Sequence, residues 1–138
     1  MSIETDREIA KRFLFTHNQA NYLEAFDEYL APDCIVHEYL PGLPDAMNRA
    51  MYEQYIAGFR AALPDVENHL EDIFVDGERV AMRWTGGGAH TGADLMQIPA
   101  SGKPVTAHGI YILRIRDGKI VEVWNHWDNL NVVAQLRG

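Results

Sequence analysis

The chain has 138 residues, of which 47% are hydrophobic and 23% are charged, and its formal net charge at pH 7 is −8. This length suits a single domain over residues 1–138 that buries about two-thirds of its unfolded surface. The negative charge, with no local cluster of lysine and arginine, disfavours nucleic acid as a partner. No apolar run approaches the ~20 residues that a membrane span needs.

The cysteine content and the first residues bear on the compartment. Cys34 is the only cysteine, so no internal disulfide can form, which is typical of a reducing cytoplasm. Residues 1–8 are acidic and polar rather than basic and then apolar, so we expect no signal peptide. We therefore expect a cytoplasmic protein without membrane association, in which Cys34 is a small buried side chain rather than a reactive thiol.

Two helical regions are expected in the first half of the chain. Apolar residues recur at spacings of three and four over residues 4–30, which predicts one long helix or two helices broken between Asn18 and Asn21. Another helix is expected at residues 46–62. Four residues at steps of four mark its apolar face: Met47, Met51, Tyr55 and Phe59.

The second half of the chain has the pattern of β-strands. Alternating apolar residues predict strands at 67–75, 79–85, 105–116 and 119–127, after a shorter strand at 34–39. Asp-Gly pairs at 76–77 and 117–118 predict tight hairpin turns, and residues 130–137 predict a closing turn or helix. Helices followed by antiparallel strands indicate an α+β fold, in which a cone-shaped curved antiparallel sheet wraps around the N-terminal helices. We expect a ligand site at the mouth of the cone.

The stretch from Phe59 to Leu136 resembles the SnoaL-like family of polyketide cyclases and ester cyclases, in the nuclear transport factor 2-like superfamily. The matching elements are Leu63-Pro64-Asp65, Arg83-Trp84, His90-Thr91-Gly92, Ile98-Pro99, Ser101-Gly102-Lys103, Asp117-Gly118-Lys119-Ile120, Trp124, Asp128 and Gln135-Leu136. The resemblance implies a cone-shaped α+β barrel, commonly a homodimer through the outer sheet face. It also implies an aldol-type closure without metal or organic cofactor, in which an acidic residue of the last strand removes a proton.

Three positions differ from the pattern of the characterised cyclases. Aligning the last two strands on the Asp117-Gly118 turn places the family's acidic residue on Asn125. The supporting histidine and glutamine of the family fall on Tyr111 and Gly109. An asparagine cannot act as a general base, so the cyclase mechanism does not carry over unchanged.

The resemblance places the face of Tyr111 and Asn125 toward the pocket. Both side chains can donate hydrogen bonds to a carbonyl or enolate oxygen, although a Tyr–Asn pair that satisfies itself is an equal alternative. Trp84 and Trp127 are expected to line the pocket or to pack in the core. His108 is a further candidate for substrate binding, yet alternation places it with His126 on the opposite, outer face.

The base must then come from another position. His37 and Glu38 lie on the strand that supplies a catalytic carboxylate in related cones, and adjacent strand residues point to opposite faces. Burial in an apolar cavity raises the pKa of a carboxyl group toward the range useful for proton abstraction. Asp128 is a third candidate, with capping of the final helix as its alternative. The histidine spacings favour no metal site.

These observations predict a cofactor-independent acid–base enzyme, with Glu38 or His37 as base and Tyr111 and Asn125 holding the enolate. Its substrate would be a small-to-medium apolar carbonyl compound. One rival is an epoxide-hydrolase-like enzyme that activates water, which an inward-facing Arg83 or Arg114 would favour. The other rival is a non-catalytic ligand-binding protein, which a cavity without carboxylate or imidazole would favour.

Overall fold

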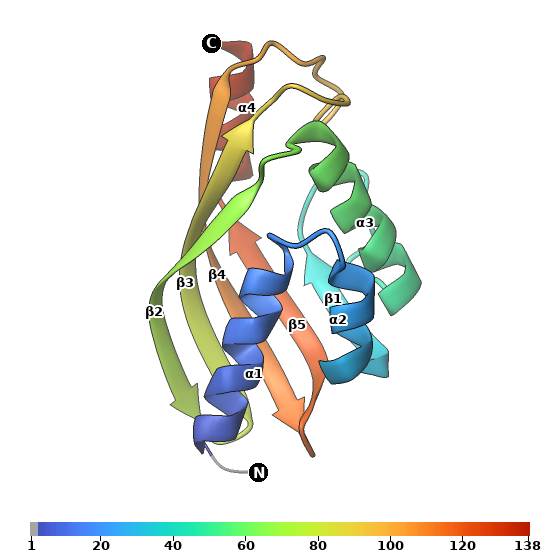
Figure 1. Cartoon of the computed structure of the whole chain (residues 1–138), viewed down its shortest axis with the longest axis vertical. Helices are drawn as coiled ribbons and strands as arrows, with labels where there is room; N and C mark the ends of the chain where they lie inside the picture. The colour runs from blue at the N-terminus through green and yellow to red at the C-terminus, as the bar shows by residue number, and fades with distance from the viewer. Residues whose placement is uncertain (1–2) are drawn as a thin grey trace.

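The computed structural model describes residues 3–138, which form four helices and one five-stranded sheet (Figure 1). Their order confirms the predicted α+β class. The elements are α1 (Ile3–Thr16), α2 (Tyr22–Tyr29), β1 (Leu30–Glu38), α3 (Arg49–Ala62), β2 (Glu67–Asp76), β3 (Arg79–Ala89), β4 (Pro104–Arg116), β5 (Lys119–Trp127) and α4 (Asn129–Arg137). The helical region at 4–30 is thus two helices, broken where the sequence allowed a break.

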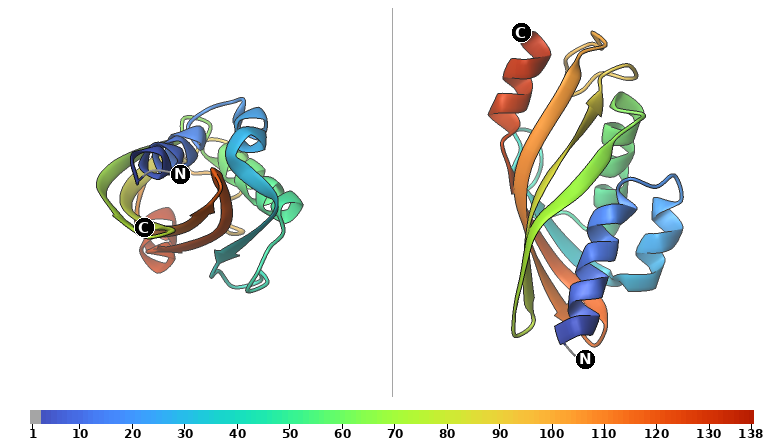
Figure 2. Two further views of the ribbon diagram at one scale, coloured as in Figure 1. Left: turned by 90° about the horizontal axis from the view of Figure 1, so that it is seen from below. Right: turned by 60° about the vertical axis from the view of Figure 1, so that its left-hand side comes forward.

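The sheet has the strand order β1-β5-β4-β3-β2 and curves around α1 (Figure 2). Strands β2 to β5 form an antiparallel meander, as predicted. The sheet is not antiparallel throughout, however, because β1 pairs with β5 in parallel. A parallel pair needs a long crossover rather than a hairpin, and here the whole of α3 and β2–β4 separates the two strands. The curved sheet remains open, with β1 and β2 at its edges.

Both predicted hairpin turns are present. Gly77 follows β2 with φ of 59°, and the Asp117–Gly118 turn has φ of 52° and 76°. Two consecutive residues with positive φ are the requirement of the hairpin turn whose twist matches that of the strands. This turn fixes the register of β4 against β5, and therefore which of their side chains face the helices.

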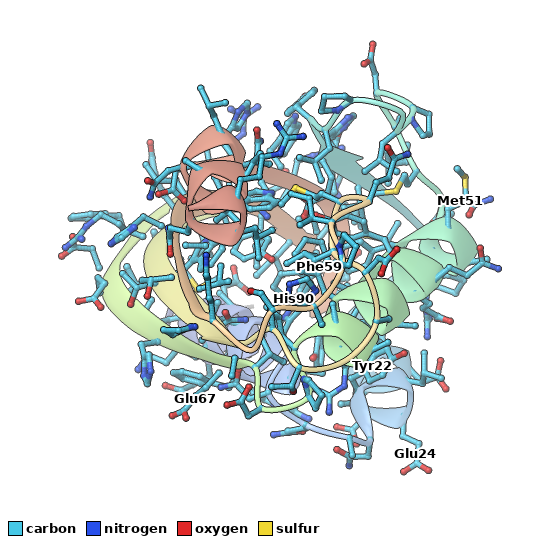
Figure 3. All side chains as sticks on the ribbon, turned by 90° about the horizontal axis from the view of Figure 1, so that it is seen from above. Tyr22, Glu24, Met51, Phe59, Glu67 and His90 are labelled. Atoms are coloured by element: carbon cyan, nitrogen blue, oxygen red, sulfur yellow. The ribbon has the colours of Figure 1, made fainter. Side chains whose placement is uncertain are left out.

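Helix α3 begins later than the sequence predicted and turns a different face inward. Asn48 caps it by accepting a hydrogen bond of 2.9 Å from the backbone N–H of Met51, whereas Met47 lies outside the helix and bridges to Val36. Met51 consequently projects outward (Figure 3). The buried face of α3 is instead formed around Tyr52 and Ile56.

Strand β3 extends past residue 85, where the predicted strand ended, and continues through the glycine run at 86–88. A Cβ atom at Gly86 would lie 1.9 Å from the side-chain oxygen of Asn68, and one at Gly87 would lie 1.8 Å from the carbonyl oxygen of Val105. The absence of side chains therefore permits close contact with both neighbouring strands. The run extends the sheet to the end where the candidate site lies.

The main core fills the space between the helices and the concave face of the sheet. Phe13 of α1 and Phe26 of α2 are fully buried there, and each contributes about 2–3 kcal/mol of apolar burial. Cys34 is buried as predicted, and burial raises the pKa of its thiol to about 12. No helix within residues 3–138 is long and apolar enough to cross a membrane.

Candidate active site

A pocket opens between α3, α4 and the concave face of β3, β4 and β5. Its walls are mainly aromatic and aliphatic, and Phe59 lies near the centre of this end of the molecule (Figure 3). Its polar lining residues are His17, Glu38, Tyr55, Arg60, Asn68, Tyr111 and Asn125. Glu38 is the only carboxylate among the described residues that line it.

Glu38 is the last residue of β1 and is 1% exposed. Three donors from two elements, α3 and β5, meet its carboxylate. The Asn125 amide donates at 2.8 Å, and the Tyr55 hydroxyl and the Trp127 indole N–H each donate at 3.2 Å. Burial raises the pKa of the Glu38 carboxyl to about 7, although these hydrogen bonds favour the charged form. A carboxyl group with this pKa is poised to take up and release a proton near neutral pH.

The sheet register brings the polar residues of the pocket into one row of paired residues that runs across neighbouring strands, here called a rung. Glu38 pairs with Asn125 across β1 and β5, and Asn125 pairs with Tyr111 across β5 and β4. Paired residues of neighbouring strands point to the same face. The predicted inward orientation of Tyr111 and Asn125 is therefore confirmed, and Glu38 rather than His37 joins them.

A second rung contains the two tryptophans on either side of a glycine. Gly109 pairs with Trp84 on β3 and with Trp127 on β5. A Cβ atom at Gly109 would lie 2.6 Å from two ring carbons of Trp84, so the glycine leaves the space in which this indole lies. Trp84 can then donate a hydrogen bond of 3.2 Å to the Asn125 side-chain oxygen.

The donor directions fix how Asn125 is oriented. An indole N–H can only donate, so the Asn125 oxygen faces Trp84 and its amide nitrogen faces Glu38. Asn125 is thus held by Trp84 and Glu38, rather than by the Tyr111 partner that the sequence offered as an alternative. Its amide nitrogen carries two hydrogens, of which the Glu38 bond uses one.

A separate chain of hydrogen bonds runs behind Tyr111. Its hydroxyl bonds to that of Tyr52, and the Tyr52 hydroxyl lies 2.7 Å from Nε2 of His17. Burial lowers the pKa of His17 to about 4, so the ring is neutral at pH 7.

The direction of this chain follows from the surroundings of His17. Nδ1 lies 2.8 Å from the Phe13 carbonyl oxygen and must carry the proton. Nε2 therefore accepts the proton of Tyr52.

His37 lies on the opposite face of β1, because it precedes Glu38 by one residue. Its Nε2 is 2.7 Å from Glu122, and its Nδ1 is 2.8 Å from the carbonyl oxygen of Asp45. Its ring also stacks on Trp124 at 5.4 Å between centroids. His37 therefore belongs to the outer face of the sheet and does not line the pocket.

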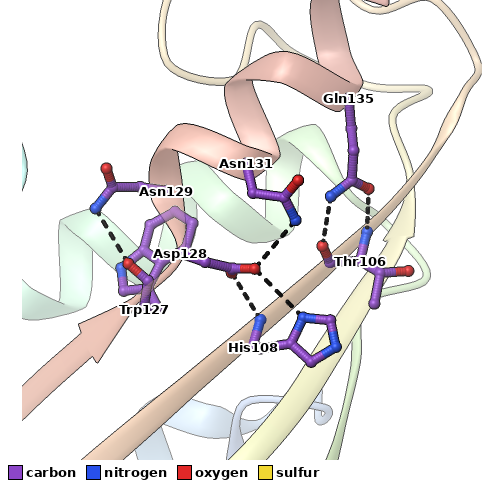
Figure 4. Close-up of polar contacts among 7 residues, drawn as sticks. All are labelled: Thr106, His108, Trp127, Asp128, Asn129, Asn131 and Gln135. Carbon is purple, nitrogen blue, oxygen red and sulfur yellow. Dashed lines mark hydrogen bonds and ion pairs between the residues drawn. The ribbon is translucent and has the colours of Figure 1, made fainter.

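Asp128 and His108 also lie outside the pocket, where they bond to each other (Figure 4). The Asp128 carboxylate accepts from the backbone N–H of His108 at 2.7 Å and from the Asn131 side chain at 3.1 Å. Asp128 occupies the N-cap position of α4, so its contacts tie that helix to β4. The structure thus brings together Glu38, Tyr111, Asn125, Trp84 and Trp127, but not His37, His108 or Asp128.

Four polar pocket residues were missed by sequence reasoning: His17, Tyr55, Arg60 and Asn68. His17 follows Phe13 by four residues, which places both on one helical face. Tyr55 was counted only as part of an apolar helical face. A tyrosine on such a face can pack its ring in the core and extend its hydroxyl into a cavity, and this property could have identified Tyr55.

The pocket offers proton transfer and hydrogen bonding rather than metal ligation. Within residues 3–138, no three His, Cys, Asp or Glu side chains gather as a metal ion would require. The polar groups present are one carboxyl group, a neutral imidazole, phenols and amides. These groups can move a proton and hold an oxygen atom that gains negative charge.

The fold is a curved sheet packed against helices, with an apolar pocket that contains one buried carboxyl group. These features define the class of small α+β proteins with a cone-shaped fold. Residues 8–136 match the family model of the SnoaL-like polyketide cyclases, and the chain belongs to this family. The resemblance seen in the sequence is thereby confirmed. A search of curated proteins found no match.

Solved structures agree with this assignment. IdmH of Streptomyces antibioticus, a proposed polyketide cyclase, is 27% identical, with 96% of this chain and 99% of that chain covered and a TM-score of 0.83. A proposed polyketide cyclase of Acidithiobacillus ferrooxidans is 29% identical, with 99% and 98% covered and a TM-score of 0.80. AclR of Streptomyces galilaeus, a proposed hydroxylase, is 23% identical, with 99% and 83% covered and a TM-score of 0.85. This last likeness shows the fold alone.

Proposed function

We propose that this protein is a cofactor-independent acid–base enzyme of the polyketide cyclase type, which removes a proton next to a carbonyl group. The observation that carries the proposal is Glu38, a buried carboxyl group with a pKa of about 7 inside an apolar pocket. Membership of a cyclase family supports it, as do two similar structures that are themselves proposed cyclases.

The reaction begins with the Glu38 carboxylate. It takes a proton from the carbon beside the substrate carbonyl, and the electrons of that C–H bond form an enolate. In an aldol-type closure the enolate carbon attacks a second carbonyl of the same molecule and forms a carbon–carbon bond. The protonated Glu38 then gives its proton to the new alkoxide, so the carboxylate is restored. Isomerisation and dehydration would use the same first step.

Tyr55 and Asn125 are the groups that we assign to the enolate oxygen. When Glu38 takes up a proton it becomes a weaker acceptor, and the Tyr55 hydroxyl can rotate its proton toward the substrate. The second amide hydrogen of Asn125 is a further donor. Tyr111 was the other predicted donor, but it bonds to Tyr52, whereas Tyr55 bonds directly to Glu38, so we assign this role to Tyr55.

The rest of the pocket supports an apolar substrate of small to medium size. Trp84, Trp127 and Phe59 supply flat aromatic walls around Glu38. Such walls bind planar carbonyl compounds by apolar contact and exclude water from the carboxyl group.

The two rivals find less support in the pocket. Water activation in the epoxide-hydrolase manner was tied to an inward Arg83 or Arg114, and these pair with Asp72 and Glu122 at the surface. The binding-protein reading was tied to a cavity without carboxylate or imidazole. Both groups are present here, as Glu38 and His17.

The first test needs no knowledge of the natural substrate. Exchange of the acidic α-protons of 2-tetralone for deuterium can be followed by NMR in D₂O with and without protein. We expect catalysed exchange by the wild type and a loss of at least about 100-fold in Glu38→Gln. Glu122→Gln, which alters the outer face, is the matched control and should exchange normally. Equal exchange by both variants would exclude Glu38 as the base.

We further propose a homodimer that forms through the outer face of the sheet. Ile110 and Ile112 of β4 are 49% and 37% exposed there, next to the half-buried Trp124 of β5. Ile110→Lys should shift the protein to monomer in analytical ultracentrifugation.

A cytoplasmic location is also proposed, on the ground of the single Cys34.

A further inference from the structure

Arg60 of α3 is the only arginine or lysine among the described residues that line the pocket. Its Nη1 donates a hydrogen bond of 2.8 Å to the His17 carbonyl oxygen, and its guanidinium lies 5.5 Å from the ring centroid of Tyr22. A guanidinium has five N–H donors in a planar fork. The contact with His17 uses one of them.

No carboxylate within residues 3–138 pairs with Arg60, which sets it apart from most arginines of the chain. Arg12, Arg49, Arg83, Arg114 and Arg116 each form an ion pair with an aspartate or glutamate. Acidic residues outnumber basic ones in the sequence, 20 to 12. A half-buried guanidinium that none of these carboxylates neutralises is an anion-binding group by its chemistry.

The position of Arg60 separates it from the base. Tyr55, which bonds to Glu38, precedes Arg60 by five residues on α3, and five residues advance about 7.5 Å along a helix axis. Asn68 lies near the same end of the pocket, because it bonds through its backbone to Asn18, the neighbour of His17. One wall of the pocket therefore carries a cation and an amide at a distance from the Glu38 carboxyl group.

We propose that Arg60 binds a carboxylate group of the substrate and thereby positions the carbon that Glu38 deprotonates. This inference rests on the proposed function for the role of Glu38. The substrate class becomes a carbonyl compound with an apolar body and a carboxylate remote from the reacting carbon. A single guanidinium in an otherwise apolar pocket suits a monoanion, whereas a phosphate dianion would call for more cationic groups.

The test compares two probes that differ only in charge, 2-naphthylacetate and 2-naphthylacetamide. Binding is measured by calorimetry and by quenching of the tryptophan fluorescence, since Trp84 and Trp127 line the pocket. The wild type should bind the carboxylate at least 10-fold more tightly than the amide. Arg60→Gln should lose this preference while keeping its affinity for the amide within about twofold. Arg60→Lys should retain part of the preference, because charge remains but the fork is lost.

Control variants separate this inference from the proposed function. Arg83→Gln removes a surface arginine that pairs with Asp72 and should leave both affinities unchanged. Glu38→Gln should lose proton exchange but keep the preference for the carboxylate, so the two proposals can fail separately. Equal binding of both probes by the wild type, or an equal loss of both in a folded Arg60→Gln, would overturn the role of Arg60.

Discussion

Glu38 and Asn125 are register partners across the parallel β1–β5 pair, and the Asn125 amide donates a hydrogen bond of 2.8 Å to the Glu38 carboxylate. The family resemblance places the cyclase acid at the position of Asn125. In this chain the carboxyl group instead lies one strand away, on the same rung and facing the same pocket. The asparagine holds that carboxyl group in place, so the rung keeps a single acidic group.

Asn125→Asp tests this arrangement by placing two carboxyl groups on the rung. Two carboxylates in hydrogen-bonding contact cannot both ionise easily, so the pair shares a proton and its apparent pKa rises. We expect the pH profile of proton exchange to move upward by about one pH unit or more. The profile should be measured from pH 5 to pH 9 by NMR exchange. An unchanged midpoint in a folded variant would show that Asn125 does not contact Glu38 in solution.

Glu38 should make the stability of the protein depend on pH with a definite sign. Burial raises its pKa from 4.5 to about 7, so between these values the folded state binds the proton more strongly than the unfolded state. Stability contributed by the protonated form is therefore lost as the pH rises through this window.

Glu38→Gln lacks this loss. Its free energy of unfolding relative to the wild type should rise by on the order of 2–3 kcal/mol between pH 5 and pH 8. Urea denaturation of both proteins at each pH measures the difference. Glu78→Gln, whose carboxylate pairs with Arg116 at the surface, should show no such rise, and a flat difference for Glu38→Gln would refute a raised pKa.

Tyr55→Phe removes one donor to Glu38 and keeps the ring, which contacts Phe59 at 5.0 Å between centroids. Loss of a donor to the developing enolate should lower kcat of exchange by about 10- to 100-fold. The stability should change by only about 1 kcal/mol. Tyr39→Phe, on the outer face and 44% exposed, is the matched control. A kcat equal to that of the wild type would remove Tyr55 from the mechanism.

Local sequence signals sufficed for most of the fold. The two Asp-Gly turns predicted the hairpins, and alternation along β4 and β5 grouped Tyr111 with Asn125 on one face. The family resemblance then placed that face toward the pocket. The parallel pairing of β1 could not be read in this way, because it depends on contacts between residues almost ninety positions apart. The inward face of α3 differs from the predicted one because the cap at Asn48 leaves Met47 outside the helix. The apolar periodicity alone does not reveal this cap.

The candidate site was predictable only in part for a related reason. Alternation allowed either His37 or Glu38 to face the pocket, and the register with β5 decides for Glu38. The contacts of Tyr55 and Arg60 arise from the packing of α3 against the sheet, and no spacing within the helix encodes them. Asp128 matched a family motif, yet its bonds to His108 and Asn131 tie it to the outside of the molecule.

Two glycines with opposite surroundings provide the last prediction. A methyl group at Gly109 would lie 2.6–2.7 Å from three ring atoms of Trp84, whereas one at Gly58 on α3 would meet nothing within 4 Å. Gly109→Ala must displace the indole and break its bond to Asn125, at a cost of about 1–3 kcal/mol in stability. Gly58→Ala should add up to about 1 kcal/mol, because alanine favours the helix.

The consequences for the site separate the two variants further. Without the Trp84 bond the Asn125 amide is free to turn. Gly109→Ala should therefore also lower kcat of exchange by about tenfold or more, because a positioning contact is lost. Gly58→Ala should leave kcat unchanged. Thermal unfolding and NMR exchange on both variants decide the matter. Normal exchange in Gly109→Ala would mean that the orientation of Asn125 does not depend on Trp84, and that the rung of Glu38 and Asn125 holds itself in place.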